Sequence, residues 1–403
     1  MFAQSAKSLS FSTQKARITT RRLCQSEFVP SVATNTTLTI PAAQDANTIT
    51  TKKDKLMSDI SKIDKNFKID TKIDRPDIVF YDVRTAPFSV HGVFYEDGKF
   101  RRMPASVAKS VSPGVYALHS NTAGGRVRFK TDSPYVAIIA KMANVGKMSH
   151  FALCGSAGFD IYVDGVFFRS YMPPFNITDG YEGVVDLCSY GMHEIMIEMP
   201  LYSDVCELYV GLKESSEILA PTPYRVEKPV VFYGSSITQG GCASRPGTCY
   251  QGFLSRELSL DYINLGFSGN ARAEDEMSDY IASLDMSVFV FDYDHNSPSV
   301  EHLKATHERM YKKIREANPS LPIIILSMPK PFLNAVELER LEVIKRTYQN
   351  ALAANDGNVY FIDGRELMNV GGADGSVDFT HPTDLGFFSM AERIKAVLRP
   401  ILE

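Results

Sequence analysis

A serine-containing turn follows a strand-like apolar run in the second half of the chain. The run begins at Val230, in VVFYGSSITQGGCAS, and ends at a glycine followed by Ser235 and Ser236. A serine hydroxyl is a poor nucleophile until a neighbouring base takes its proton, and the base works best when a third group fixes its tautomer. The turn is therefore a candidate nucleophile position if the chain also supplies a base and an orienting group.

Three later segments carry the polar residues that acyl transfer needs. They are GFSGN at 266–270, DYDHN at 292–296 and DFTHP at 378–382. In the last of them, Asp378 and His381 are three residues apart in a short loop before a helical stretch. The carboxylate can therefore lie beside the imidazole and orient it toward a serine.

Acyl transfer also needs donors for the negative charge that develops on the carbonyl oxygen. The backbone N–H groups of Ser236 and Gly269 and an asparagine side chain could supply them. Glycines let a backbone approach a ligand closely, which favours the second segment for this purpose. Together, the four segments predict a serine hydrolase.

The elements that must position these segments alternate between strand and helix. Five strand-like runs, VVFYG, YINLGF, SVFVFDY, PIIILSMP and NVYFID, are separated by stretches with apolar residues at helical spacing. Such alternation predicts a parallel sheet covered by helices, and ligands of such sheets lie beyond the carboxyl ends of the strands. All four polar segments follow predicted strands or precede the final helix.

The preceding part of the chain has a different pattern. Between about Asp77 and Leu212, short runs such as GRVRFK and HEIMIEM alternate apolar and polar residues. Asp164-Gly165 stands between two apolar runs and predicts a two-residue hairpin. This half is therefore predicted to be an antiparallel β-sandwich. The predicted boundaries are 57–214 for the sandwich, 215–229 for a proline-containing linker and 230–403 for the catalytic domain.

Composition limits the classes of function. The chain has 403 residues and a formal net charge of −4, which gives no signature of a nucleic-acid partner. No apolar run approaches the roughly 20 residues of a membrane span, so we expect a soluble protein without a membrane partner. Six scattered cysteines predict reduced thiols and a cytoplasmic location, although Cys242 and Cys249 could meet.

The first 56 residues are predicted to be a disordered extension. They are rich in Ser, Thr, Arg and Ala and lack hydrophobic periodicity. No secretory h-region is present, whereas the Arg- and Ser-rich, acid-poor composition is compatible with an organelle transit peptide. A non-functional extension is the alternative.

Residues 228–403 resemble the SGNH (GDSL-type) hydrolases, whose four blocks are matched in order by Gly234-Ser235-Ser236, NLGFSGN, DYDHN and DFTHP. Upstream, GFDIY at 158–162 is similar to the GxDLY motif, which names a β-sandwich domain found before one branch of these hydrolases. Members of that branch are commonly described as acetyl-xylan or carbohydrate esterases. The resemblance implies an α/β SGNH-hydrolase domain preceded by an antiparallel β-sandwich domain.

The resemblance also implies roles for individual residues. Ser236 would be the nucleophile, His381 the general base and then acid, and Asp378 the residue that orients His381. Gly269 and Asn296 would be oxyanion-hole donors beside the Ser236 amide.

The chain departs from the family pattern at three places. Ser235 replaces the Asp of the GDS triplet, and Ile161 replaces the Leu of GxDLY. In the GxND block, Asp294 stands for the Gly and Ser297 for the Asp. Asn296 lies between these two substituted positions, in the block from which its oxyanion role is inferred.

Competing motifs fit less well. DYDHN has the spacing of the start of a calcium loop but lacks the Gly and the Glu that should follow, and GSSITQGG lacks the Gly-Lys-Ser/Thr of a phosphate loop. We therefore expect neither a metal nor an organic cofactor. Asp160, Tyr162 and Arg272 are candidates for substrate binding, although Asp160 and Tyr162 could merely lie on a strand and Arg272 could pair with an acidic neighbour.

The sequence thus predicts a serine esterase that hydrolyses short-chain acyl esters, acetyl esters above all, of carbohydrates through an acyl-enzyme. Its partner would be a small-molecule or oligosaccharide ester, and the oligomeric state is left open. The alternatives are a carbohydrate-binding protein with an inactive hydrolase domain, and a lipid or aryl esterase.

Overall fold

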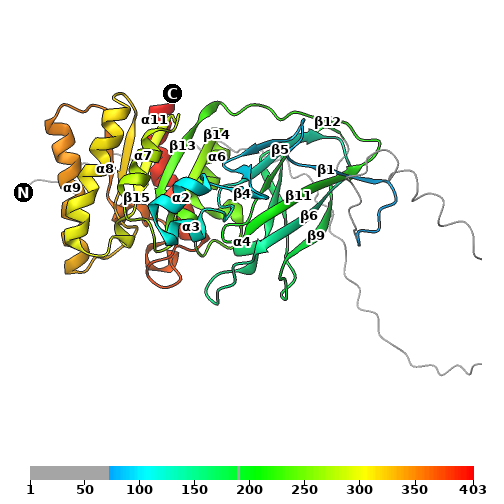
Figure 1. Ribbon diagram of the computed structural model, residues 1–403, viewed down its shortest axis with the longest axis horizontal. Helices are drawn as coiled ribbons and strands as arrows, with labels where there is room; N and C mark the ends of the chain where they lie inside the picture. Colours follow the sequence, from blue (N-terminus) through cyan, green and yellow to red (C-terminus); the bar gives the residue numbers. More distant parts are fainter. Residues whose placement is uncertain (1–71, 188–190) are drawn as a thin grey trace, which may run out of the picture. The chain divides into compact units, whose positions relative to one another are not determined.

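The computed structural model describes residues 72–187 and 191–403. The predicted extension 1–56 lies outside the described residues, and so does Cys188. The described residues belong to one body, which contains both the sandwich and the α/β part (Figure 1). The assignment of separate domain boundaries remains a prediction.

The second half of the chain forms the predicted parallel sheet. Its five strands lie in the order β14-β13-β15-β16-β17 and every neighbouring pair is parallel. The strands are β13 (Val226–Gly234), β14 (Leu260–Gly266), β15 (Val288–Asp292), β16 (Ile323–Leu326) and β17 (Val359–Ile362). The main helices are α6 (Tyr250–Leu258), α7 (Asp275–Ala282), α8 (Val300–Ala317), α9 (Ala335–Ala353) and α11 (Asp384–Leu402).

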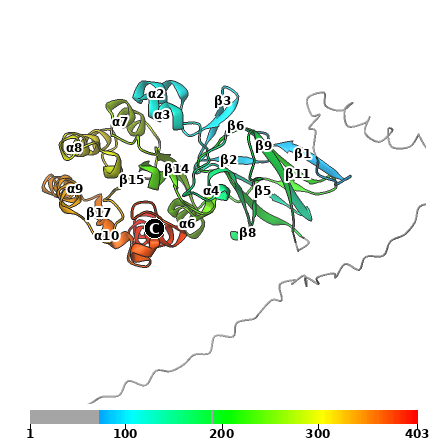
Figure 2. The same ribbon diagram turned by 90° about the horizontal axis from the view of Figure 1, so that it is seen from below.

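Helices cover both faces of this sheet (Figure 2). Side chains of a strand point alternately to its two faces. Accordingly Val231, Phe289 and Ile323 belong to the core that includes α7, α8 and α9. Their neighbours Phe232, Val290 and Ile324 belong to the core that includes α6 and α11. Burial on both faces explains why these strands read as continuous apolar runs.

The first half forms two antiparallel sheets, which confirms the predicted β-sandwich. One sheet has the order β1-β11-β6-β9 and the other β12-β5-β10-β7-β8, with β2 also paired to β5. The first sheet contains β1 (Ile78–Asp82), β6 (Tyr135–Asn144), β9 (Gly180–Asp186) and β11 (Asp204–Lys213). The second contains β2 (Ser89–His91), β5 (Arg126–Thr131), β7 (Phe159–Val163), β8 (Val166–Tyr171), β10 (His193–Glu198) and β12 (Ile218–Leu219). Strands β3 (Phe94–Glu96) and β4 (Lys99–Arg101) pair separately.

Local predictions in this half hold where side-chain alternation is regular. Val127 and Phe129 of GRVRFK are buried in the core between the two sheets. Asp164 and Gly165 both have positive φ, 51° and 77°, and join β7 to β8 as a hairpin.

Two features differ from the predicted pattern. Helices α2 (Ala105–Val111) and α3 (Pro113–Leu118) interrupt the strands, and their apolar residues pack into the core of the α/β part rather than that of the sandwich. The predicted linker 215–229 contains β12 and the start of β13. Short helices and two-residue strands have too few residues to show periodicity, so the sequence did not indicate them. The remaining short helices are α4 (Leu153–Ala157), α5 (Ser236–Gln239) and α10 (Gly364–Leu367).

Two buried arginines from the first half close the free edge of the parallel sheet. Strand β14 lies at the end of the strand order, so the carbonyl groups on its outer side need other partners. Arg126 of β5 donates to the carbonyl of Tyr262 at 3.1 Å, and Arg102 donates to those of Asn264 at 3.1 Å and Gly266 at 2.5 Å. The acceptors are alternate residues, as the pleat of a strand requires.

Arg126 also neutralises a carboxylate at this edge. Its side chain is fully buried and forms an ion pair with Asp261, which His91 contacts at 3.1 Å. The guanidinium lies 3.8 Å from the centre of the Tyr262 ring, a cation–π contact. The two halves are thus joined by charge-assisted hydrogen bonds as well as by apolar packing.

We expect Arg126→Met to destabilise the protein by about 1–3 kcal/mol, because it leaves the half-buried Asp261 carboxylate and buried backbone carbonyls without this donor. Chemical denaturation measures the change. Lys228→Met is the control, since Lys228 pairs with Asp285 at the surface and both side chains are more than half exposed, so it should cost less than about 1 kcal/mol. Equal losses of stability in the two variants would contradict a structural role for the pair of Arg126 and Asp261.

Candidate active site

The carboxyl ends of three strands meet at the serine turn. Gly234 of β13 is in register with Gly266 of β14 and with Asp292 of β15. A Cβ atom on Gly234 would lie 2.2 Å from the Asp292 carbonyl oxygen, and one on Gly266 would lie 2.1 Å from the Gln239 nitrogen. Glycine is therefore required at both strand ends, because any side chain would push the turn away from the sheet.

The turn itself begins a short helix, α5. Ser235 is the N-cap, and its hydroxyl accepts a hydrogen bond from the Ile237 N–H at 3.2 Å. An aspartate at an N-cap can accept the same hydrogen bond, so the substitution of Ser for Asp in the triplet preserves the local structure. Ser235 is completely buried, whereas Ser236 is 8% exposed. Of the two serines, Ser236 is the one that a substrate can reach.

Ser236, His381 and Asp378 form one hydrogen-bonded chain. The Ser236 Oγ lies 2.8 Å from His381 Nε2, and His381 Nδ1 lies 2.8 Å from Asp378 Oδ2. The other carboxylate oxygen, Oδ1, accepts hydrogen bonds from the backbone N–H groups of His381 at 2.7 Å and Thr380 at 3.0 Å. This is the arrangement in which a serine gives its proton to an oriented imidazole.

Asp378 remains ionised because of these hydrogen bonds. Burial by itself would raise its pKa, but the donors from His381 and Thr380 and the nearby His381 ring lower the pKa of Asp378 to about 2. A negative Asp378 holds the proton of His381 on Nδ1, so the lone pair of Nε2 faces Ser236.

The two other predicted oxyanion donors lie in neighbouring loops. Gly269 is exposed and has a φ of 70°, in the turn that follows β14. Asn296 ends a 3₁₀ turn after β15, and its Oδ1 accepts from the Ala271 N–H at 3.3 Å. That bond ties the two loops together, so the predicted donors come from adjacent segments. Their role in oxyanion binding remains a prediction.

The structure places the candidate substrate residues Asp160 and Tyr162 in the interior, where their polar atoms bind other parts of the chain. Both are at most 1% exposed. The Asp160 carboxylate accepts hydrogen bonds from the Arg245 side chain and the Gly247 N–H, both at 2.9 Å, and the Tyr162 hydroxyl accepts from Arg245 at 2.7 Å. The motif in the sandwich therefore holds the loop that follows the serine turn.

That loop in turn holds the helix that follows His381. Ser244 and Thr248 donate hydrogen bonds to the carboxylate of Asp384, the first residue of α11, at 2.8 Å from the Ser244 N–H and 2.7 Å from the Thr248 hydroxyl. Asp384 thus connects the serine loop to the histidine loop. No local pattern in the sequence indicates a contact between residues more than 130 positions apart.

Arg272, the third substrate candidate, is exposed beyond the glycine-containing loop. Burial raises the pKa of Glu274, and the nearby Arg272 charge opposes that rise. Both sequence interpretations of Arg272, as a substrate-binding residue and as the partner of an acidic neighbour, remain predictions.

The sandwich contributes further residues to the site that the sequence did not indicate. The Tyr202 hydroxyl donates to the Ser236 carbonyl at 3.3 Å. His150, in the irregular connection between β6 and α4, has its ring centre 5.9 Å from that of His381. Cys242 and Cys249 are both free thiols, so they do not form a disulfide. Burial, with a further contribution from Asp378, raises the pKa of Cys242 to about 11, which leaves it protonated and poorly nucleophilic at neutral pH.

A buried pair of carboxyl groups lies at the end of β15. Neither carboxylate oxygen of Asp292 has a hydrogen-bond partner among the described residues, and Asp294 has one unpaired oxygen. Burial raises the pKa of Asp292, and the Asp294 charge raises it further. Burial also raises the pKa of Asp294, against a hydrogen bond from the Met328 N–H. The residue that replaces the family's glycine therefore creates a pair of buried carboxyl groups with raised pKa values close to the serine turn.

The fold and the Ser–His–Asp chain at its strand ends define a hydrolase of the SGNH type. Residues 227–399 match the GDSL-like Lipase/Acylhydrolase family, and residues 78–218 match the GxDLY domain described as the N-terminus of SGNH-hydrolase-type esterases. The two parts of the chain thus match the two domains of these esterases, as the four blocks and GFDIY predicted.

Solved structures support the same fold. A protein described as a GDSL-like lipase from Bacteroides ovatus is 28% identical, with a TM-score of 0.72 over 81% of this chain and 98% of that one. The salicylyl-acyltransferase SsfX3 of a tetracycline biosynthetic pathway is 20% identical, with a TM-score of 0.68 over 81% and 98%. An acetyl xylan esterase from Butyrivibrio proteoclasticus is 13% identical, with a TM-score of 0.52 over 81% and 98%.

No curated protein matched the chain. Within residues 72–187 and 191–403, no helix has both the length and the apolar character that crossing a bilayer requires.

We expect Asp378→Asn to lower kcat roughly 10²- to 10⁴-fold with little change in KM, because a neutral amide no longer holds the His381 proton on Nδ1. Steady-state hydrolysis of 4-nitrophenyl acetate measures both constants. Asp374→Asn, an exposed aspartate of the same loop, should behave like the wild type. A normal kcat in the Asp378 variant would remove Asp378 from the proposed triad.

The buried carboxyl groups of Asp292 and Asp294 predict a second effect, on the stability of the fold. The folded-state pKa of Asp292 is raised above its unfolded value, so its favourable contribution is complete at low pH and is lost as pH rises through the folded pKa. Asp292→Asn should therefore raise Tm at pH 8, by roughly 2–4 °C for each kcal/mol gained, and have little effect near pH 4. Thermal unfolding across this range, with the exposed Asp285→Asn as control, tests it; parallel pH profiles of the Asp292 variant and the wild type would contradict it.

Proposed function

We propose that this protein is a serine esterase that removes short acyl groups, acetyl above all, from a carbohydrate. The observation that carries the proposal is the hydrogen-bonded chain Ser236–His381–Asp378, with 2.8 Å at each side-chain step. Its members come from the first and last of the four polar segments, in the order typical of the family.

The proposed reaction needs only this chain of residues and water. Ser236 Oγ attacks the ester carbonyl while His381 Nε2 takes its proton. His381 then gives that proton to the departing sugar hydroxyl, which leaves an acyl group on Ser236. A water molecule, deprotonated by His381, attacks the acyl group and releases the carboxylic acid. Donors from Ser236, Gly269 and Asn296 would stabilise the oxyanion in both steps.

Several observations support a sugar ester as substrate. The structural relative from Butyrivibrio is an acetyl xylan esterase, and the same arrangement of sandwich and α/β sheet is present here. The rim of the site is open, because the Asp378 side chain is 44% exposed and Gly269 is exposed as well. An open site of this kind suits an acyl group on a large polar molecule better than a long apolar chain.

The same acyl-enzyme would also serve an acyltransferase. SsfX3 has a higher TM-score and identity to this chain than the acetyl xylan esterase has, and it transfers a salicylyl group. The acceptor that attacks the acyl group, water or another hydroxyl, distinguishes the two activities.

The decisive experiment measures acetate release from a panel of acetylated glycans. Ser236→Ala should lose at least about 10³-fold in rate, because no other hydroxyl replaces the nucleophile. Ser235→Ala is the matched control: it removes the N-cap, at a cost of about 1 kcal/mol in stability, and should retain hydrolysis. A fluorophosphonate should label Ser236 in the wild type and in the Ser235 variant.

Each other outcome points to a specific alternative. Full turnover by Ser236→Ala would exclude the mechanism. Binding of xylo-oligosaccharides by a wild type that releases no acetate and resists labelling would indicate a sugar-binding protein. A rate that increases with acyl length in a series of 4-nitrophenyl esters would indicate a lipid or aryl esterase. Acyl transfer to an added alcohol in preference to water would indicate an acyltransferase.

A further inference from the structure

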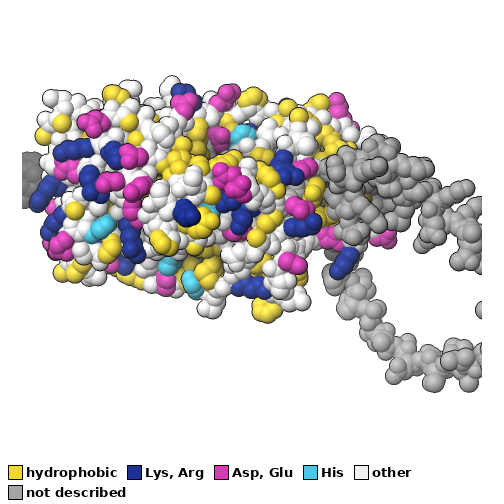
Figure 3. Space-filling model, viewed as in Figure 1, with side chains coloured by type: hydrophobic (Ala, Val, Ile, Leu, Met, Phe, Trp, Pro, Cys, Tyr) yellow, Lys and Arg dark blue, Asp and Glu magenta, His cyan; other side chains and the backbone are white. Residues whose placement is uncertain are grey.

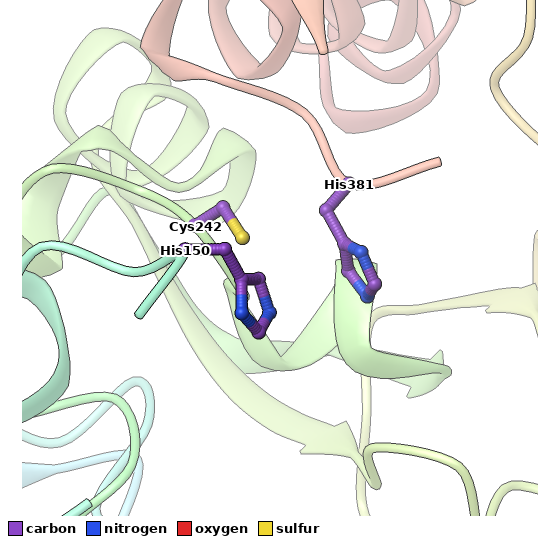
Figure 4. Close-up of side chains that lie close together, drawn as sticks. All are labelled: His150, Cys242 and His381. Carbon is purple, nitrogen blue, oxygen red and sulfur yellow. The ribbon is translucent and has the colours of Figure 1, made fainter. Parts of the chain in front are cut away.

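Three potential metal ligands meet at the mouth of the candidate site. The ligand atoms of His150, Cys242 and His381 all lie within 4.8 Å of one another. Figure 4 shows the two imidazole rings and the thiol extending side by side from three separate segments. These segments are the connection between β6 and α4, the loop after α5, and the loop before α11.

The donor set suits zinc. Zn²⁺ binds imidazole nitrogen at about 2.0–2.1 Å and thiolate sulfur at about 2.3 Å, so the ligand atoms of a tetrahedral site lie roughly 3.3–3.6 Å apart. The most distant pair of these atoms needs to approach by up to about 1.5 Å. His150 is exposed on an irregular connection, so its ring can make that movement. Three protein ligands leave the fourth position for water.

The surroundings of His381 are those of a metal-bound histidine. In metal sites the second ring nitrogen is usually hydrogen-bonded to a carboxylate, which fixes the tautomer and makes the ligating nitrogen more basic. His381 Nδ1 has this bond to Asp378, at 2.8 Å. Its free lone pair is therefore on Nε2, the atom that lies 2.8 Å from Ser236 Oγ.

We propose that His150, Cys242 and His381 form an inhibitory Zn²⁺ site. Zinc takes the lone pair of Nε2, the Cys242 thiol releases its proton to water as the sulfur–zinc bond forms, and His150 completes the set. Ser236 then has no base, so hydrolysis stops until a chelator removes the metal. The binding site stands on its own geometry, whereas the inhibition rests on the proposed esterase function.

Zinc binding by the full chain tests the site without any assay of activity. Equilibrium dialysis of the chelator-treated protein should give one Zn²⁺ fewer in His150→Ala and Cys242→Ala than in the wild type. Cys206→Ala, which removes a free thiol of the sandwich sheet, is the matched control and should bind as the wild type does. Cys242 has a φ of 74°, so Cys242→Gly, which tolerates that backbone, replaces the alanine variant if the latter is unstable.

Two catalytic variants make the binding test sharper. Ser236→Ala should bind zinc at least as well as the wild type, since it removes the competitor for Nε2. Asp378→Asn should bind it roughly 10- to 100-fold more weakly, the usual effect of removing a ligand's carboxylate partner. Co²⁺ should give a sulfur-to-metal charge-transfer band in the wild type that is absent from the Cys242 variants. Equal zinc binding by the wild type, His150→Ala and Cys242→Ala would overturn the site.

The inhibition is tested by hydrolysis of 4-nitrophenyl acetate with and without added Zn²⁺. Each variant is compared with its own rate in EDTA, so a change in basal rate caused by His150→Ala or Cys242→Ala does not affect the comparison. The concentration of Zn²⁺ that halves the rate should rise at least about 10-fold in both, and EDTA should restore the wild type. Zinc bound at this site with an unchanged rate would overturn the inhibition and leave the site. A wild type without activity that still binds zinc would overturn the proposed function only.

Discussion

The free edge of strand β14 is the constraint on which the arrangement of the molecule depends. A parallel sheet of five strands must end somewhere, and the carbonyl groups on the outer side of its last strand need donors. Here the donors are two buried guanidinium groups, Arg126 and Arg102, supplied by the first half of the chain. Burial lowers the pKa of Arg102 to about 10, which still leaves it charged at neutral pH. The sandwich is therefore part of the structure of the hydrolase sheet.

The closed edge brings the sandwich to the serine turn. Strand β14 ends at Gly266, next to that turn, so residues that follow the sandwich strands come close to it. The GxDLY segment uses this proximity, because Asp160 and Tyr162 hold the loop at Arg245. Through Asp384 the same loop is tied to the helix that follows the candidate base. Hydrogen bonds to Asp384 thus hold the nucleophile loop and the base loop together.

The carboxyl groups near the serine turn differ in the number of hydrogen-bond donors that surround them. Asp378 is stabilised as an anion by three hydrogen bonds, whereas burial disfavours the charged form of Asp292. The pKa values of these two carboxyl groups are thus shifted in opposite directions, because one has donors and the other has none among the described residues. His381 Nε2 has a single lone pair. The Ser236 hydroxyl and a metal ion therefore compete for it.

The fold class and the serine, histidine and aspartate of the candidate site could be predicted from the sequence alone. Regular alternation along the strands and four blocks in a known order are local signals, and the 2.8 Å contacts agree with them. Only the tertiary structure decided the rest: the burial of Asp160, the arginines at the sheet edge, and the approach of His150 and Cys242 to the base. These contacts join irregular segments far apart in the chain, and such segments have no periodicity from which their partners could be predicted.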